Sequence, residues 1–317
     1  MSGRSQTPTV MVSSWSDGLT VLQGGDVRRA FEGALTCGLT SDGAGGAYVI
    51  VDSRELWAFS PGGDWRLMGS GDFPLRCCVA VGGRVLAGTD DARVLELSGD
   101  SFSPMDSFEA TPGRERWYAG AALIDGEWMG PPLGVRSMTA SCDGQALLVN
   151  VHVGGIPWST DGGRTWTPTI DLDADVHQVC AHPSRPEIVA AASAVGLCVS
   201  RDGGQGWSIT TDGLHAGYCS AVALTEDALY VAASSDHFAA QGAVYRRGID
   251  SDGPLERVGG GLPEWLDGIA DTYCIDARGD DLAIVDHSGS LYGSQNQGSS
   301  WSLWAQGLPA PSGVLIC

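Results

Sequence analysis

The sequence contains no lysine, because all 18 of its basic residues are arginine, and these stand against 38 aspartate and glutamate residues. A Schiff base formed through a lysine is therefore excluded. The formal net charge of −20 repels nucleic-acid phosphates and anionic lipid, so we predict neither a nucleic-acid partner nor a membrane partner. The chain also lacks the uninterrupted apolar run, about 18 residues long, that a membrane-spanning helix requires.

Close cysteine pairs of the Cys-x-x-Cys kind, which metal fingers and redox motifs use, are absent among the nine cysteines. An odd number of cysteines, with Cys77 and Cys78 adjacent, favours free thiols in a reducing compartment. The polar pair Ser13 and Ser14 comes too early for the apolar segment of a secretion signal. We therefore expect a cytoplasmic protein. Most of the cysteines fall in predicted innermost strands, where a soft-metal ring is the alternative to small buried apolar side chains.

Helical periodicity is almost absent, and short β-rich runs alternate with turn-forming residues along the whole chain. Equivalent apolar positions recur at spacings of 37, 38, 62, 41, 46 and 48 residues. Units of about 40 to 50 residues with four short antiparallel strands are typical of β-propellers. The sequence therefore predicts an all-β, seven-bladed β-propeller in a single domain, residues 1–317, with an insertion at about 109–136 in blade 4. The equivalent positions are Leu19, Leu56, Val94, Ile156, Leu197, Ala243 and Leu291.

Each predicted unit has strands a to d, from the innermost to the outermost. In the fifth unit these strands are residues 176–183, 187–194, 196–202 and 206–214. The first unit begins at its b strand, residues 9–15, and the chain ends on a strand without a partner, residues 313–317. We expect this last strand to become strand a of blade 1 and to close the ring, which leaves no open sheet edge.

One turn sequence occurs three times. The stretch STDGGRTW at 159–166 returns as SRDGGQGW at 200–207 and, with Asn296 in place of aspartate, as SQNQGSSW at 294–301. Glycine permits positive φ, the aspartate carboxylate accepts turn amides, and Trp166 or Trp207 can pack between sheets. A copied turn of this kind indicates a structural unit rather than a binding site.

These turns resemble the Asp-box, or BNR-repeat, hairpins of a propeller family that includes sialidases, sortilin-type receptors and photosystem II assembly factors. The overall pattern is most similar to bacterial BNR-repeat proteins. The resemblance implies a propeller with the turns between strands c and d, on the face away from the ligand. The chain has no Arg-Ile-Pro segment and no evident arginine trio, so it departs from sialidases and no sialidase residue can be transferred.

Five of the six histidines fall in predicted connections that form one face over the central channel. Imidazoles beside carboxylates can bind a metal or perform general acid–base catalysis. We predict His152, His177 and His215, in the adjacent blades 4, 5 and 6, as ligands of a divalent metal such as Zn²⁺, Mn²⁺ or Fe²⁺. The alternative is that these histidines are ordinary solvated loop residues.

Other residues of the same face are candidates for catalysis or substrate contact. The predicted catalytic residues are Asp175, Asp267, Asp271, Tyr218 and Tyr273. The predicted substrate contacts are Asn150, His237, His287, Trp265 and Trp117. Trp265 could equally be a wedge between blades. The insertion at 109–136 could be a lid over the site or the contact surface of a homo-oligomer.

Three functional hypotheses follow. The first is a hydrolase or lyase with a His/Asp pocket at the channel mouth, acting on a small polar or glycan-like substrate, with or without a metal. The second is a propeller that binds a glycan or small polar ligand on this face without turnover. The third is an assembly protein that uses its rim and the insertion. We favour the enzyme, because five imidazoles on one face exceed what a scaffold requires.

Overall fold

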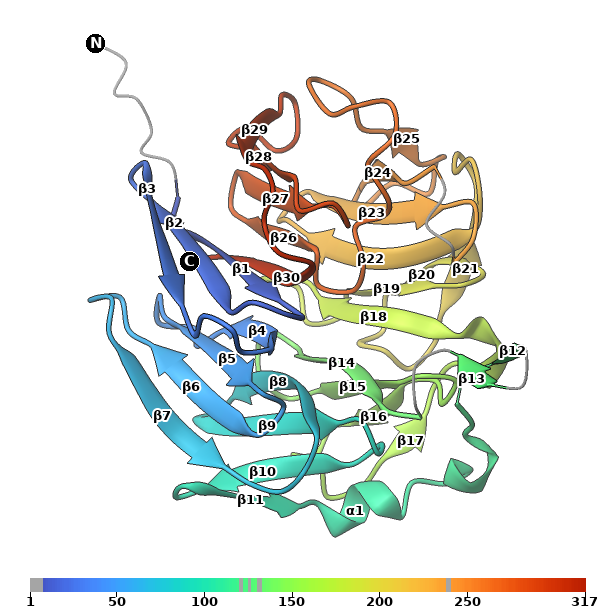
Figure 1. Cartoon of the computed structure of the whole chain (residues 1–317). Helices are drawn as coiled ribbons and strands as arrows, with labels where there is room; N and C mark the ends of the chain where they lie inside the picture. The colour runs from blue at the N-terminus through green and yellow to red at the C-terminus, as the bar shows by residue number, and fades with distance from the viewer. Residues whose placement is uncertain (1–7, 120–121, 125–126, 130–132, 238–240) are drawn as a thin grey trace.

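The computed structural model describes residues 8–119, 122–124, 127–129, 133–237 and 241–317. Strands make up 48% of the chain and helices 3%, so the predicted all-β class is confirmed. Figure 1 shows the strands gathered into sheets around a common centre, in a propeller-like arrangement. No helix in these ranges is long and apolar enough to cross a membrane. The only α-helix in them is α1 (Asp106–Glu109), and short 3₁₀ turns occur at Arg114–Arg116 and Leu172–Ala174.

The strands form antiparallel units of four. The first unit contains β30 (Pro311–Ile316), β1 (Val10–Ser14), β2 (Leu19–Gln23) and β3 (Asp26–Ala30). The next two units share one eight-stranded sheet. They contain β4 (Thr36–Ser41), β5 (Ala47–Val51), β6 (Glu55–Phe59) and β7 (Trp65–Ser70), then β8 (Leu75–Val81), β9 (Arg84–Thr89), β10 (Val94–Ser98) and β11 (Ser101–Pro104).

The remaining units follow in chain order, after the small hairpin of β12 (Ala122–Ile124) and β13 (Glu127–Met129). They contain β14 (Val135–Ala140), β15 (Leu147–Val151), β16 (Pro157–Ser159) and β17 (Thr167–Pro168); β18 (Val176–Ala181), β19 (Val189–Ser193), β20 (Gly196–Ser200) and β21 (Ser208–Thr210); β22 (Tyr218–Leu224), β23 (Ala228–Ser234), β24 (Ala243–Gly248) and β25 (Glu256–Arg257); and β26 (Ile275–Arg278), β27 (Asp281–Val285), β28 (Leu291–Ser294) and β29 (Ser302–Ala305). The apolar positions that defined the repeat all lie within one residue of the start of the third strand of a unit.

The two ends of the described chain meet in one sheet. β30 pairs antiparallel with β1, and Met11 lies opposite Leu315 in the register. Figure 1 shows this red strand beside the blue N-terminal strands. The side chains of all six residues of β30 are buried, so the last strand belongs to the core.

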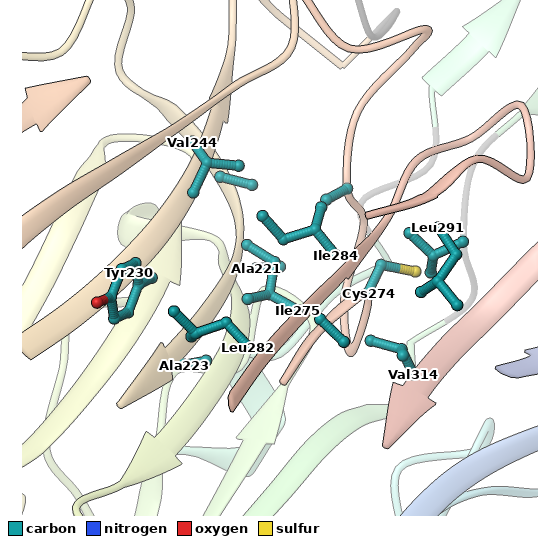
Figure 2. Packing of buried hydrophobic residues seen from close by; sticks show 14 of the residues in the cluster. Ala221, Ala223, Tyr230, Val244, Cys274, Ile275, Leu282, Ile284, Leu291 and Val314 are labelled. Atoms are coloured by element: carbon teal, nitrogen blue, oxygen red, sulfur yellow. The ribbon is translucent and has the colours of Figure 1, made fainter. Parts of the chain in front are cut away.

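The core lies between neighbouring sheets. Figure 2 shows such a cluster, in which Ala221, Tyr230 and Val244 of one unit face Leu282 and Ile284 of the next. Tyr230 is fully buried, and its hydroxyl donates a hydrogen bond to the carbonyl oxygen of Gln297, 2.8 Å away. Small alanines on the inner strands allow large side chains to fill the widening space further out, because core side chains must interdigitate.

The repeated turns join the third and fourth strands of their units. Ser159 Oγ accepts the amide of Gly163 at 2.9 Å, and Asp161 Oδ1 accepts the amide of Thr165 at 2.9 Å. Gly162 and Gly163 have φ values of 75° and 88°, which favour glycine. The same bonds recur at 200–207 and, through the Asn296 amide oxygen, at 294–301. The turns therefore perform a structural task, as the sequence predicted.

We expect Ser159→Ala to lower the free energy of unfolding by about 1–2 kcal/mol, because the buried amide of Gly163 would lose its acceptor. Denaturant unfolding of the variant measures this loss. Ser101→Ala, at an exposed strand position, is the matched control and should leave the unfolding midpoint unchanged. Equal stability of both variants would contradict the structural role of the turn.

All nine cysteines are free, as the sequence predicted. Cys37, Cys180 and Cys219 lie in the innermost strands β4, β18 and β22. Across the described ranges, no group of three or more cysteine, histidine, aspartate or glutamate side chains is placed to hold a metal ion. The buried thiols, Cys37, Cys77, Cys78, Cys198, Cys219 and Cys274, pack as small apolar groups, whereas Cys142 is exposed.

Candidate functional site

Four successive innermost strands carry the same β-bulge near their first residues. In β8, β14, β18 and β22 the register with the next strand shifts by one residue, and the extra residues are Arg76, Arg136, His177 and Ser220. A bulge redirects the side chain of the extra residue and is frequent beside active sites. Two guanidinium groups and an imidazole are thus presented at the same end of three adjacent units.

Asp175 lies at the centre of the candidate site, between two histidines. Its carboxylate oxygens are 3.4 Å from Nε2 of His152 and 3.7 Å from Nε2 of His177. Both histidines are buried, whereas the Asp175 side chain is 31% exposed and can meet a ligand. The residue has φ 43° and ψ 73°, a left-handed conformation that follows the 3₁₀ turn Leu172–Ala174. Such backbone geometry is uncommon outside glycine and often marks a functional position.

The ring of His177 has a fixed tautomer. Its Nδ1 lies 2.6 Å from the carbonyl oxygen of Cys219, which can only accept, so Nδ1 carries a hydrogen. In the neutral ring Nε2 is then an acceptor that faces the carboxylate. Neither Nε2 of His177 nor Oδ1 of Asp175 has a hydrogen-bond partner among the described residues, although both atoms are buried. The pair can therefore share a proton or receive a donor group of a ligand.

The Asp175 carboxylate is ionised at neutral pH. Burial tends to raise the pKa of Asp175, but the neighbouring His177, with the positive charges of His152 and Arg136, lowers it below the usual value. An ionised carboxylate beside two imidazoles stabilises a protonated ring. This is the arrangement that general acid–base catalysis uses.

Further polar residues border this centre. Arg136 lies 4.0 Å from Asp271 and donates to the hydroxyl of Thr272 at 3.5 Å. The rings of Tyr218 and His177 have centroids 4.7 Å apart. Burial, with the nearby carboxylates of Asp271 and Asp175, raises the pKa of Tyr218 to about 12 despite the opposing charge of Arg136. Tyr218 therefore stays protonated at neutral pH and can donate a hydrogen bond.

The axial mouth beside this centre is a small pocket of about 30 Å³ lined by Arg76, Arg136, Asp271 and Tyr273. Arg76 lies 4.1 Å above the ring of Trp15 and 3.8 Å from the carboxylate of Asp90. Distances of 3.8 and 4.0 Å to the nearest carboxylates leave guanidinium N–H groups available to a ligand. The mouth therefore suits an oxygen-rich group of a substrate.

The predicted trio of metal ligands does not assemble. His215 Nδ1 lies 2.7 Å from the hydroxyl of Tyr245, and its ring packs on Trp265 with centroids 5.0 Å apart. His152 and His177 instead meet at Asp175. His215 therefore lies apart from this pair, since Tyr245 and Trp265 of its own surroundings hold its ring. Desolvation, with the charge of Arg257, also lowers the pKa of His215.

Three residues predicted as substrate contacts or catalytic groups already make contacts with other residues of the chain. We predicted Trp117 as a substrate contact, but it is buried against Phe108 and a substrate cannot reach it. One face of Trp265 is covered by the guanidinium of Arg257, 4.0 Å from the ring. The hydroxyl of Tyr273 accepts the amide of Met138 at 3.1 Å, and burial raises the pKa of Tyr273 far above its usual value. Tyr273 therefore closes the floor of the mouth and is not a nucleophile.

The other predicted residues differ in burial, and the hydrogen bonds of Asn150 and Asp267 are with residues other than Asp175. Asn150 is fully buried and donates to Ser137 at 3.3 Å. Asp267 is exposed beside Asp286, whose carboxylate accepts its amide at 3.3 Å. His237 and His287 are exposed in turns after β23 and β27. Three segments of the insertion at 109–136, residues 120–121, 125–126 and 130–132, lie outside the described residues, so its predicted role as lid or dimer contact stays a prediction.

Sequence reasoning missed Arg76 and Arg136. Each arginine directly follows the first apolar residue of its innermost strand, as His177 does in β18. Alignment of these three strand starts is the signal that could have found them. The bulge that turns their side chains leaves no mark in the hydrophobic pattern.

No family model and no protein with a curated description matches the chain. Its fold is similar to a 6-phosphogluconolactonase candidate from Bacteroides fragilis, with 14% identity over 99% of this chain and 100% of the other and a TM-score of 0.63. The GH74 enzyme of Niastella koreensis has 13% identity over 92% of this chain and 46% of the other, with a TM-score of 0.58. The Pan2 WD40 domain of Neurospora crassa has 11% identity over 86% and 79% of the two chains and a TM-score of 0.54. At such identities the likeness shows the fold alone, which is propeller-like.

Proposed function

We propose that the chain is a seven-bladed β-propeller of the Asp-box type, closed through its C-terminal strand. In support, the innermost strands contact one another in the cyclic order β30, β4, β8, β14, β18, β22, β26 and β30 again. The pairing of β30 with β1 supports closure, and the shared hydrogen bonds of the three turns support the Asp-box type. The closed ring would bring the bulge residues to one axial mouth.

We further propose that this mouth is the active site of a hydrolase or lyase that acts on a small polar or glycan-like substrate. One observation carries the proposal: an ionised carboxylate, Asp175, lies between two imidazoles, and buried atoms of this group lack hydrogen-bond partners. Buried polar atoms without partners are rare in folded proteins and frequently await a ligand. Two of the similar structures, the lactonase candidate and the GH74 enzyme, are named as enzymes, which agrees with this proposal.

The roles of the residues follow from their chemistry. His177, held by the Cys219 carbonyl, would transfer a proton to or from the substrate through Nε2. Asp175 would stabilise the imidazolium that forms, and His152 would share its charge. Tyr218 would donate a hydrogen bond, while Arg136 would bind oxygen atoms of the substrate.

A divalent metal is not part of this proposal. With His215 bound to Tyr245, two imidazoles and one carboxylate remain, and no set of three ligands in the described ranges is placed around a common point. The residues present do not fit the predicted Zn²⁺, Mn²⁺ or Fe²⁺ site, and we derive no step through a metal.

The second candidate is a propeller that binds a glycan or small polar ligand at the same mouth without turnover. The small volume of the axial pocket, about 30 Å³, favours it, because only part of a ligand can enter. The same residues would then provide hydrogen bonds and charge alone.

A turnover screen of the full chain against lactones, aryl esters and aryl glycosides tests the proposal, with an absorbance assay for the unsaturated product of a lyase. We expect turnover of at least one class and a loss of about 100-fold or more in His177→Gln, because the proton-transferring nitrogen is removed. Saturable binding without turnover would favour the second candidate instead. Parallel assays with a chelator and with added Zn²⁺, Mn²⁺ or Fe²⁺ test the metal prediction. A rate that depends on the metal would contradict the proposed metal-free mechanism.

A further inference from the structure

A second axial cavity lies below Tyr273, on the side away from Asp175. Its inner part has a volume of about 220 Å³, and it opens into a funnel of about 680 Å³ lined by turns between the first and second strands of the units. Asp276 and Thr139 line both the inner part and the funnel, so the two are continuous. Tyr273 lines the inner part and the mouth pocket, so its ring separates the two axial sites. The lower cavity is therefore reached from the opposite face.

The inner part has a mixed polar and apolar lining. Asp276 is its one carboxylate, and no arginine or histidine lines it within the described residues. The thiol of Cys180 also lines it, but burial raises the pKa of Cys180 to about 12, so this group is neutral. The apolar residues that line it include Met138, Val179, Val222, Leu224, Ile275 and Val314.

Asp276 lacks a counter-charge in direct contact. Its Oδ2 accepts the amide of Ile316 at 2.7 Å, and the backbone amide of Ala277 also stabilises the carboxylate. Ion pairs among the described residues do not include Asp276, and Arg278 acts on it only from a distance. Burial raises the pKa of Asp276 to about 6, so the group is charged at neutral pH and incompletely solvated. A bound cation would offset that cost.

We propose that this cavity binds a small organic ammonium ion, with the charged nitrogen against Asp276 and the carbon chain within the inner part. A net charge of −20 concentrates cations at the surface and favours their entry. A bare divalent ion fits less well, because no group of three ligands lies in the described part of the chain. This site does not depend on catalysis at Asp175.

Calorimetric titration of the full chain with propylammonium at neutral pH tests the proposal. Propanol and propionate have the same chain length without the positive charge, and they are the matched ligands. We expect saturable binding of one propylammonium, about tenfold or more tighter than propanol, and no binding of propionate. Equal binding of propylammonium and propanol, or no binding of propylammonium up to about 50 mM, would overturn the proposal.

The matched variants are Asp276→Asn and Asp280→Asn, the second at an exposed turn position four residues further on. The asparagine at 276 keeps an acceptor for Ile316, and we expect it to weaken propylammonium binding about tenfold or more while propanol binding is unchanged. Asp280→Asn should bind as the unsubstituted protein does, and loss in both variants would refute a specific site. If Asp276→Asn does not fold, Ala181→Leu is used in its place. Ala181 lines both the funnel and the inner part, so leucine there narrows the passage between them, and unchanged propylammonium binding in this variant would also refute the proposal.

Discussion

Asp175→Asn is expected to reduce turnover at the channel mouth by about 10²–10⁴-fold, the range in which a positioned acid–base group contributes. The asparagine is nearly isosteric, but it removes the negative charge that lies 3.4 Å from His152 and 3.7 Å from His177. Without that charge, neither imidazole is stabilised in its protonated form, so the transition state loses its proton donor. Steady-state kinetics on a substrate identified by the turnover screen, compared as kcat and KM, measure the effect.

The matched control for this variant is Asp173→Asn, an exposed aspartate two residues earlier in the same turn. Because it makes the same chemical change outside the cluster, we expect its kcat to stay within about twofold of the unsubstituted enzyme. Melting curves of both variants separate a catalytic effect from unfolding. A folded Asp175→Asn variant with full activity would contradict the proposed mechanism.

The same charge predicts the acid side of the pH profile. Because the pKa of Asp175 lies below its usual value near 3.8, the carboxylate is already ionised at that pH, and its contribution is lost only as pH falls through the lower folded-state value. The residual activity of the Asp175→Asn variant should therefore lack the fall at acid pH that protonation of this carboxylate causes, which a pH–rate profile measures.

Removal of residues 311–317 is expected to prevent stable folding. β30 buries Val314, Leu315 and Ile316 in the spaces between sheets, and each such side chain contributes about 1.5–3 kcal/mol. Together these three approach the whole stability of a typical domain, about 5–15 kcal/mol. The truncation also removes the backbone partner of β1 and the hydrogen bond from the Ser312 hydroxyl to the carbonyl oxygen of Thr36, at 2.6 Å.

Soluble yield, circular dichroism and denaturant unfolding measure this second effect. Removal of Cys317 alone is the control, because that half-buried residue lies beyond β30, and we expect a folded protein. A synthetic peptide of residues 311–317 should partly restore the truncated chain by occupying the free edge of β1. A truncated protein with an unchanged unfolding midpoint would show that β30 is dispensable, and it would also contradict closure of the ring through this strand.

Local patterns made most of the strands predictable. The apolar positions from Leu19 to Leu291 mark the third strands, because a strand and its turn occupy a fixed length of chain. The turn at Ser159 was predictable for the same reason, since its hydrogen bonds join atoms only four residues apart. The pair of His152 and Asp175 was partly predictable, since both stand in connections at one end of neighbouring units.

Side-chain direction at the innermost strands was not predictable. Arg76 and Arg136 reach the axial mouth because a bulge adds one residue, and the period of two that a strand pattern follows does not reveal such a shift. Trp117 looked like a stacking surface in the insertion, yet Phe108 and the neighbouring core bury it. His215 looked equivalent to His177, but it lies in a bend before β22, where the hydroxyl of Tyr245 in β24 holds its ring.

The sequence by itself determined the all-β class, the four-stranded units, the free thiols and the structural role of the repeated turns. Each of these depends on interactions between residues close in the chain or on average composition. Only the tertiary structure decided which polar groups meet: the pairing of His152 and His177 at Asp175, the two arginines at the mouth, and the ring of Tyr273 between two axial sites. These contacts join residues of different units, or depend on bulges and inter-sheet packing, and no local pattern encodes that geometry.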